Sequence, residues 1–241
     1  MQLTHLKNPI VAHRGAWLEF DLPENSVASL KKAIEIGVGA TEFDVHMTLD
    51  DVLVVHHDSD YFGLPIEKTL YTDLQKHVLP NNETLPTVAQ FLEIGLKQKQ
   101  TKLVFEIKSS VLSDARTLQI VDKVVTLVKS NAYSDRLEFI MFSWEGAQYL
   151  KKQLPAYKVS YLNGDKTPDQ IVQANLDGID YHITTFKKFP NYISECKARN
   201  LLLNSWTVNY PEDIIFLLDE KFDMITTNKP LEFLKLYLDR K

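Results

Sequence analysis

The sequence is poor in cysteine, in positive charge and in long apolar runs, and each shortage excludes a class of protein. Its 241 residues include one cysteine, Cys196, so neither an intrachain disulfide nor a thiolate-rich zinc site can form, and a reducing cytoplasm is expected. The formal net charge of −5 offers no basic surface for a nucleic-acid backbone, so no nucleic-acid partner is expected. A small anionic substrate remains compatible, since a cation bound among carboxylates inverts the local field.

The apolar residues are spread along the chain. No stretch approaches the ~20 apolar residues that span a bilayer, so we expect no transmembrane segment. Residues 1–9 lack the basic segment and apolar run of a secretory signal, which we interpret as the untrimmed start of a cytoplasmic protein. Hydrophobic residues make up 44% and charged residues 24%, as in globular proteins, and no Gly/Ser linker divides the chain. We therefore predict a single domain over residues 1–241.

Short β-branched or apolar runs alternate with longer amphipathic segments, a pattern that indicates a parallel sheet. The predicted strands are Pro9–His13, Thr41–His46 with its hairpin partner Val52–His57, Leu103–Ile107, Leu137–Phe142, Lys158–Leu162, Gly178–Ile183, Leu201–Trp206 and Phe222–Thr226. The predicted helices are Ser26–Ile36, Val88–Lys97, Ala115–Lys129, Glu145–Gln153, Asp169–Asn175, Pro190–Arg199, Pro211–Glu220 and Leu231–Leu238.

If Thr41–His46 and its hairpin partner Val52–His57 are counted as one strand position, the pattern has eight. This number favours a closed (β/α)8 TIM barrel over a doubly wound open sheet. The glycine-rich turn of a dinucleotide fold is absent after the first strand, where His13-Arg14-Gly15 stands. Residues 59–82 carry few periodic apolar positions and are predicted to form an insertion over the barrel mouth.

Polar side chains gather at the carboxyl ends of the predicted strands, which in a barrel surround one mouth. They are His13 with Arg14, Glu42 with Asp44, His57 with Asp58, and Glu106 with Lys108. Two residues that stand two positions apart in a strand project to the same face, so the carboxylates of the second and third strands converge.

Three carboxylates, Glu42, Asp44 and Glu106, would repel one another at this mouth without a cation. Oxygen ligands favour Mg²⁺ or Ca²⁺, and Mn²⁺ could substitute. The two histidines of the cluster then remain for proton transfer, and its arginine and lysine can balance the charge of a phosphate. Alternatives stay open: Lys108 could be a structural cation that pairs with Glu106, and His46 on the same face could be a ligand.

The ordered set of motifs resembles the glycerophosphodiester phosphodiesterase family over essentially the whole chain. The matching residues are His13-Arg14-Gly15, Pro23-Glu24-Asn25-Ser26, Glu42-Phe43-Asp44-Val45, Thr48 with Asp50, His57-Asp58, Leu85-Pro86-Thr87, Glu106-Ile107-Lys108, Phe142-Ser143, Trp206-Thr207-Val208-Asn209 and Asp223 with Thr226.

The resemblance implies a metal-dependent barrel that hydrolyses a small-molecule glycerophosphodiester to an alcohol and sn-glycerol 3-phosphate. The nucleophile could be the 2-hydroxyl of the substrate or a water molecule. The implied site residues are His13 and His57 as general acid and base, Glu42, Asp44 and Glu106 as metal ligands, and Arg14, Lys108, Trp206 and Asn209 as substrate contacts.

Two departures from the family pattern bear on substrate choice. Asn228 stands where the family usually has an aspartate, and the segment between His57 and Leu85 is shorter than the usual insertion. One rival function is a lysophospholipase D-like phosphodiesterase with a lipid substrate, for which the Tyr61-Phe62-Gly63-Leu64 segment is the one hint of an apolar rim. Another is a barrel that binds phosphorylated polyols without turnover, which would not require two proton-transfer groups. Trp206 could also be simple barrel packing.

Overall fold

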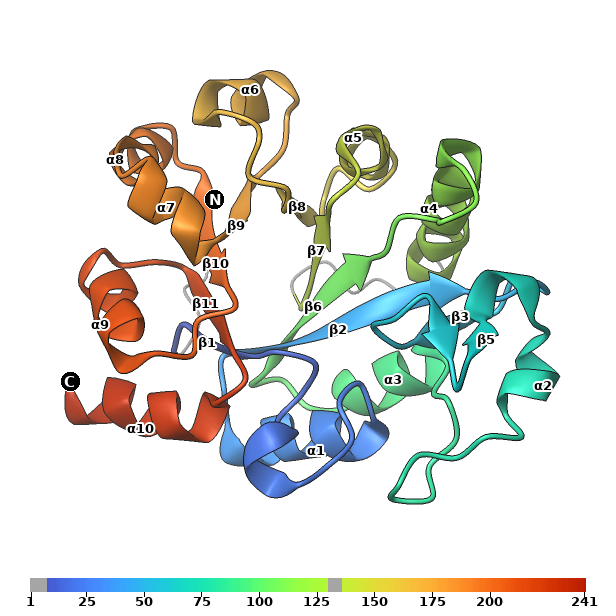
Figure 1. Cartoon of the computed structure of the whole chain (residues 1–241). Coiled ribbons are helices and arrows are strands. Elements are labelled where there is room, and N and C mark those ends of the chain that lie inside the picture. The colour runs from blue at the N-terminus through green and yellow to red at the C-terminus, as the bar shows by residue number, and fades with distance from the viewer. Residues whose placement is uncertain (1–7, 130–135) are drawn as a thin grey trace.

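Eight parallel strands close into a barrel at the centre of the molecule (Figure 1). The computed structural model describes residues 8–129 and 136–241. Residues 1–7, which belong to the segment in which no secretory signal was found, lie outside these ranges. The barrel strands are β1 (Ile10–Ala12), β2 (Ala40–Met47), β6 (Lys102–Ile107), β7 (Leu137–Met141), β8 (Lys158–Tyr161), β9 (Gly178–His182), β10 (Leu202–Trp206) and β11 (Met224–Thr227). The ring closes because β1 pairs with both β11 and β2. The predicted TIM barrel is confirmed.

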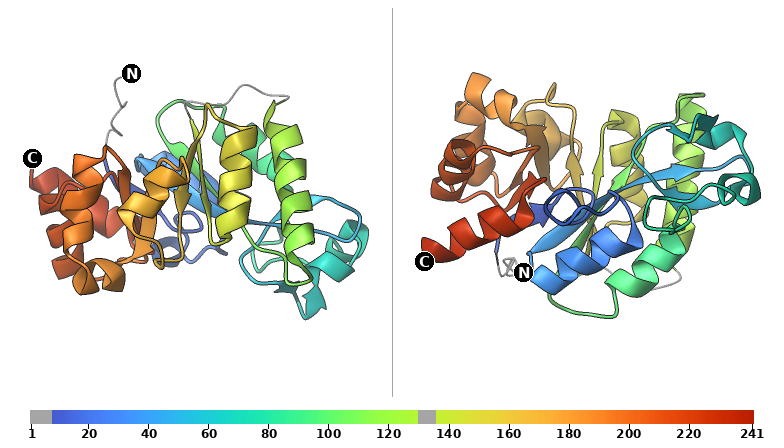
Figure 2. Two further views of the ribbon diagram at one scale, coloured as in Figure 1. Left: turned by 90° about the horizontal axis from the view of Figure 1, so that it is seen from above. Right: turned by 60° about the horizontal axis from the view of Figure 1, so that its bottom comes forward.

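Helices surround the strands, as the end and side views show (Figures 1 and 2). They are α1 (Val27–Ile36), α3 (Val88–Gly95), α4 (Asp114–Lys129), α5 (Trp144–Gln153), α6 (Pro168–Gln173), α7 (Ile183–Lys188), α8 (Asn191–Ala198), α9 (Pro211–Asp219) and α10 (Pro230–Asp239), with the 3₁₀ turn η1 (Leu18–Phe20) before α1. Ser26 caps the start of α1 and Thr167 caps the start of α6, each with a capping box. Every predicted helix is present.

The sequence pattern did not predict α7. Its sequence, Ile-Thr-Thr-Phe-Lys-Lys, opens with three β-branched residues, which have low helix propensity and favour continuation of the strand before it. In the structure the side chain of His182 accepts a hydrogen bond from the backbone N–H of Thr184 and so begins the helix. A local cap has therefore outweighed propensity.

Successive side chains of a barrel strand point alternately outward and inward, so the strands contribute to two separate hydrophobic clusters. Outward residues such as Phe43, Val45 and Tyr181 pack against the helices in the main hydrophobic cluster. Inward residues fill the barrel itself in a second, smaller cluster, made up of Val11, Ala40, Val104, Ile140, Leu162 and Met224, with Phe142 and Trp206 packed against it. The barrel interior is thus a packed core, with polar side chains near its mouth and the ion pair between Lys102 and Glu138 toward the amino ends of β6 and β7.

The segment after β2 forms its own small unit at one side of the barrel (Figures 1 and 2). It contains β3 (Leu53–Val55), antiparallel to β2, followed by β4 (Asp60–Tyr61), β5 (Leu64–Pro65), η2 (Ile66–Lys68) and α2 (Tyr71–Leu74). Val54, Tyr61, Ile66, Leu74 and Leu85 make a separate hydrophobic cluster beneath it. Residues 59–82 therefore hold regular structure, and their assignment as an insertion within one domain stays a prediction.

No helix in the described ranges has both the length and the hydropathy needed to cross a bilayer. The result agrees with the absence of a long apolar run in the sequence.

Candidate active site

A pocket of about 150 Å³ opens at the carboxyl ends of the barrel strands. Its lining contains most of the predicted site residues together with an apolar wall. The lining residues are His13, Arg14, Glu42, His57, Glu106, Lys108, Ile140, Phe142, Leu162, Asp180, Trp206, Thr207 and Thr226. The pocket lies where a TIM barrel carries its active site.

Three buried carboxylates meet at this pocket. Glu42 and Asp44 lie in β2, and Glu106 lies in β6 with its Cα opposite that of Asp44. One oxygen of each residue falls within 4.8 Å of the others, and the residues are 2%, 1% and 8% exposed, respectively. The pairing register of two parallel strands therefore brings together the three residues that their spacing predicts.

The cluster fits a hard divalent cation. Glu42 Oε1 is buried without any hydrogen-bond partner in residues 8–129 and 136–241. Burial and the neighbouring Asp44 raise the pKa of Glu42 well above its ordinary value, and the same causes raise the pKa of Glu106 to about 7. These crowded carboxylates resist ionisation, and one of their oxygens is unpaired. A bound cation would stabilise their ionised form. The all-oxygen donor set suits Mg²⁺ or Ca²⁺.

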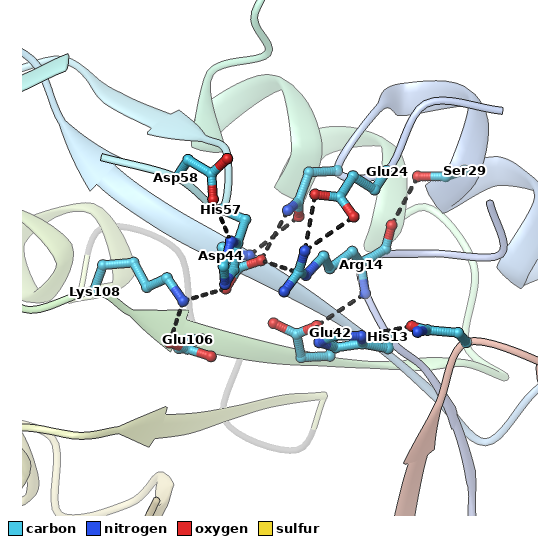
Figure 3. A network of polar contacts seen from close by, with 12 residues as sticks. His13, Arg14, Glu24, Ser29, Glu42, Asp44, His57, Asp58, Glu106 and Lys108 are labelled. Atoms are coloured by element: carbon cyan, nitrogen blue, oxygen red, sulfur yellow. Dashed lines mark hydrogen bonds and ion pairs between the residues drawn. The ribbon is translucent and has the colours of Figure 1, made fainter. Parts of the chain in front are cut away.

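Two cations lie beside the carboxylates (Figure 3). Lys108 Nζ is 2.9 Å from Asp44 Oδ1 and 2.7 Å from Glu106 Oε1. Although burial disfavours its charge, Asp44 and Glu106 raise the pKa of Lys108 to about 12, so the ammonium stays charged. Lys108 both pairs with these carboxylates and lines the pocket, so a structural role and a substrate-binding role are compatible.

Arg14 joins the cluster through both its backbone and its side chain. Its backbone N–H donates to Glu42 Oε2 at 2.9 Å, from a left-handed conformation with φ of 57°. Its guanidinium forms a two-pronged contact with the Glu24 carboxylate at 2.9 and 3.0 Å, while Nε lies 3.5 Å from Asp44 Oδ2. Glu24 thus fixes the direction of the guanidinium, and Arg14 faces the pocket already charged and oriented.

The two predicted proton-transfer residues face the same pocket with different partners. His13 Nδ1 is 2.7 Å from Asn228 Oδ1, and His57 Nδ1 is 2.7 Å from Asp58 Oδ1. Burial, followed by the positive charge of Arg14, lowers the pKa of His13 to about 4. The hydrogen bond from His57 lowers the pKa of Asp58, so this carboxylate is ionised beside the ring. Each histidine therefore has its Nδ1 held by a neighbouring side chain, and His13 Nε2 lies 3.9 Å from Glu42 Oε2.

Asn25 contributes a contact that its sequence position did not reveal. Asn25 Nδ2 donates to Asp44 Oδ2 at 2.8 Å, and Asn25 Oδ1 accepts from the Asp44 backbone N–H at 3.2 Å. Beside Ser26 it resembles a helix cap, but Ser26 alone caps α1. The asparagine instead fixes the carboxylate, and an amide before a capping serine is the one signal that could have suggested it.

Trp206 and Asn209 have different environments. Trp206 lines the pocket, with its indole N–H donating to the backbone oxygen of Asp180 at 2.8 Å and its ring edge-to-face with Phe142. Asn209 is not among the pocket residues; its Oδ1 accepts from the Asn228 backbone N–H at 2.9 Å. The structure thus brings Trp206 into the site, whereas substrate contact by Asn209 stays a prediction.

Comparison with known proteins gives consistent matches along the chain. A family model described as the glycerophosphoryl diester phosphodiesterase family matches residues 13–232. A solved glycerophosphodiester phosphodiesterase from Parabacteroides distasonis has a TM-score of 0.93 and 35% identity, and the match covers 98% of this chain and 99% of that one.

Two further proteins extend the comparison. A glycerophosphodiester phosphodiesterase from Caldanaerobacter subterraneus is 26% identical over 245 residues, covering 96% of this chain and 98% of that protein. The structure of an Oleispira antarctica phosphodiesterase in complex with the product sn-glycerol-3-phosphate has a TM-score of 0.80 at 21% identity, with 97% of both chains covered, and shows that the fold is shared.

Proposed function

The chain belongs to the glycerophosphoryl diester phosphodiesterase family and is a phosphodiesterase, and from this premise we propose that it uses a divalent cation to hydrolyse glycerophosphodiesters to an alcohol and sn-glycerol 3-phosphate. The observation that carries the proposal is the group of three buried carboxylates at a pocket that also holds two histidines and two cations. The Oleispira antarctica phosphodiesterase, bound to sn-glycerol-3-phosphate, supports a small-molecule substrate.

Glu42, Asp44 and Glu106 would hold the cation, which we propose to be Mg²⁺ or Ca²⁺, with Mn²⁺ able to substitute. When bound, it supplies positive charge that stabilises the phosphate oxygens as negative charge develops on them. Arg14 and Lys108 line the same pocket and would hold the phosphate through charged hydrogen bonds.

His13 and His57 would transfer protons, and their hydrogen bonds favour one division of labour. The amide oxygen of Asn228 can only accept, so His13 Nδ1 carries the hydrogen and Nε2 has the free lone pair. The lowered pKa of His13 keeps this ring neutral, which suits a general base. His57 lies against the Asp58 carboxylate, the partner that a positively charged ring needs, and we assign it the general acid.

The pocket favours a small substrate over a lipid. Its volume is about 150 Å³, and within the described part of the chain none of residues 59–82, the predicted source of an apolar rim, lines it. Trp206 and Phe142 would form one wall around the glycerol group. A cytoplasmic location remains a prediction that rests on the single cysteine, which is buried and unpaired.

The test is release of glycerol 3-phosphate from glycerophosphocholine and glycerophosphoethanolamine with Mg²⁺, with Ca²⁺ and with a chelator. We expect activity with either cation and none with the chelator. His13→Ala and His57→Ala should each reduce kcat by roughly 10²–10⁴ while the thermal unfolding curve stays cooperative. Activity that ignores the chelator would refute the cation, and near-wild-type turnover in either variant would remove that histidine from proton transfer.

A further inference from the structure

One polar side chain in the pocket has no part in the proposed chemistry. Asp180, the third residue of β9, lines the pocket among Ile140, Leu162 and Trp206. Its neighbours Ile179 and Tyr181 pack outward into the main core, so alternation turns the Asp180 side chain into the barrel. A carboxyl group has therefore been placed in the apolar part of the pocket wall.

One oxygen of this carboxyl group has no hydrogen-bond partner among the residues that the structure describes. Asp180 is 2% exposed, and the oxygen in question is its buried Oδ1. The nearby indole N–H of Trp206 donates to the backbone oxygen of Asp180 and leaves the side chain free. An unpaired buried polar atom costs about 1–3 kcal/mol, so folding stability does not explain its presence.

The neighbouring strand repeats the feature. Asn204 in β10 is the Cα partner of Asp180, is also 2% exposed, and has Oδ1 buried without a partner in residues 8–129 and 136–241. Two unpaired acceptors thus lie side by side inside the barrel. Unpaired buried acceptors of this kind are usually completed by a ligand or by water.

The protonation state of Asp180 indicates which ligand chemistry suits it. Burial, together with the negative charges of Glu106 and Glu138, raises the pKa of Asp180 to about 8. At neutral pH the group is therefore largely a neutral carboxylic acid, which both donates and accepts. A hydroxyl group also donates and accepts, so it matches this partner better than an ammonium group does.

We propose that Asp180 is a specificity-determining residue that hydrogen-bonds the terminal hydroxyl of the glycerol group of the substrate. The inference rests on the proposed function. Arg14 and Lys108, which would hold the phosphate, line the same pocket as Asp180, and the terminal hydroxyl is the part of the glycerol group that lies farthest from the phosphorus. Asp180 would thereby select glycerol esters over esters of diols that lack this hydroxyl.

The experiment compares two substrates with the same leaving alcohol: a glycerophosphodiester and its propane-1,2-diol analogue, which keeps the 2-hydroxyl and replaces the terminal hydroxyl by hydrogen. The ratio of their kcat/KM values is measured for the wild type, Asp180→Leu, Asp180→Asn and Ser160→Ala. Ser160 is the matched control, because it is a buried polar residue of the adjacent strand β8 that does not line the pocket.

We expect the wild type to prefer the glycerol substrate by about 30-fold or more, because the analogue leaves a buried polar group unpaired. Asp180→Leu should reduce the preference to within about threefold of unity, whereas Asp180→Asn, which still donates and accepts, and Ser160→Ala should keep most of it. These comparisons do not depend on Asp180→Leu alone, since the wild-type preference and Asp180→Asn test the same contact.

Other results would overturn the proposal. Equal use of both substrates by the wild type, or a preference that survives in Asp180→Leu, removes the hydroxyl contact while leaving phosphodiester hydrolysis intact. A loss in Asp180→Asn as large as in Asp180→Leu would show that the residue acts through charge, as for an ammonium group. A wild type that hydrolyses neither substrate contradicts the proposed function itself, and this inference with it.

Discussion

Two buried glutamates in different regions of the molecule have opposite surroundings. Glu67 lies in η2 beside the barrel and is 3% exposed; its oxygens accept from the Ser110 hydroxyl at 2.6 Å and the Val111 backbone N–H at 2.9 Å. Glu42 at the barrel mouth is 2% exposed, and one of its oxygens accepts a single backbone N–H while the other has no partner in the described part of the chain.

The difference distinguishes a buried carboxylate whose hydrogen bonds are made within the fold from one whose hydrogen bonds are left incomplete. The cost of burying Glu67 is offset by hydrogen bonds that attach the segment after β3 to the loop after β6. The cost of burying Glu42 is not offset within the protein, and Asp44 beside it adds repulsion. A carboxylate whose hydrogen bonds the fold satisfies serves the structure, and we infer that one left unsatisfied, such as Glu42, serves a ligand.

The largest expected effect is on catalysis at the unsatisfied site. Glu42→Gln should lower kcat/KM by roughly a thousandfold or more, since a lost cation ligand removes several kcal/mol of transition-state stabilisation. The melting temperature should stay equal or rise, because the substitution removes a repulsive buried charge. Glycerol 3-phosphate release and thermal unfolding measure the two quantities. A variant that is destabilised and still active would reverse the comparison.

The next effect concerns pH and a second unsatisfied carboxyl group, Asp180. Its pKa of about 8 in the folded chain exceeds its ordinary value of 3.8. Its contribution to stability is therefore fully present below about pH 4 and is lost as pH rises through 8. The free energy of unfolding of wild type minus that of Asp180→Asn should fall across this range in denaturant titrations. Ser160→Ala, the control, should show a difference that does not vary with pH.

Glu67→Gln should lower stability and leave activity nearly unchanged, the opposite of the pattern expected for Glu42→Gln. We expect a loss of about 1–3 kcal/mol in the free energy of unfolding, because a backbone N–H and a hydroxyl lose a charged acceptor. The value of kcat/KM should remain within about tenfold of wild type, because Glu67 does not line the pocket. Urea titration and the substrate assay measure these. A large loss of activity without loss of stability would place Glu67 among the functional residues.

A last effect, on stability alone, sharpens the distinction with the cation itself. At a concentration 100 times its Kd, Mg²⁺ or Ca²⁺ should stabilise the wild type by about 2.7 kcal/mol, which raises the melting temperature by roughly 5–10 °C. Glu67→Gln should retain this increment and Glu42→Gln should lose most of it. An equal increment in both variants would mean that the cation binds elsewhere.

The strands and the core of the site were predictable because their signals are local. Alternation of apolar residues predicts the barrel strands, and the spacing of Glu42 from Asp44 and of Glu106 from Lys108 predicts a shared face. Each of these signals is contained in one short segment, so no knowledge of the pairing between strands is required. The prediction of a carboxylate cluster follows once the barrel is assumed.

The other contacts depend on register between distant segments. Asn25 stands before a capping serine, and its bond to Asp44 spans 19 positions along the chain. Asp180 becomes the neighbour of Asn204 only through the pairing of β9 with β10. Apart from the position of the Asn25 amide before a capping serine, the local pattern does not distinguish these residues from ordinary caps and surface carboxylates, because their partners are set by how the barrel closes.

The bond between His13 and Asn228 has a consequence for how the enzyme is assembled. The two residues are 215 positions apart and meet because β1 pairs with the last strand, whereas the contacts of Arg14 with Glu24 and of Asn25 with Asp44 span 10 and 19 positions. Short loops close before long ones, so the carboxylates can be arranged early in folding. The orientation of His13 therefore depends on closure of the barrel by its last strand, whereas the two shorter contacts, which orient Arg14 and Asp44, lie within residues 14–44.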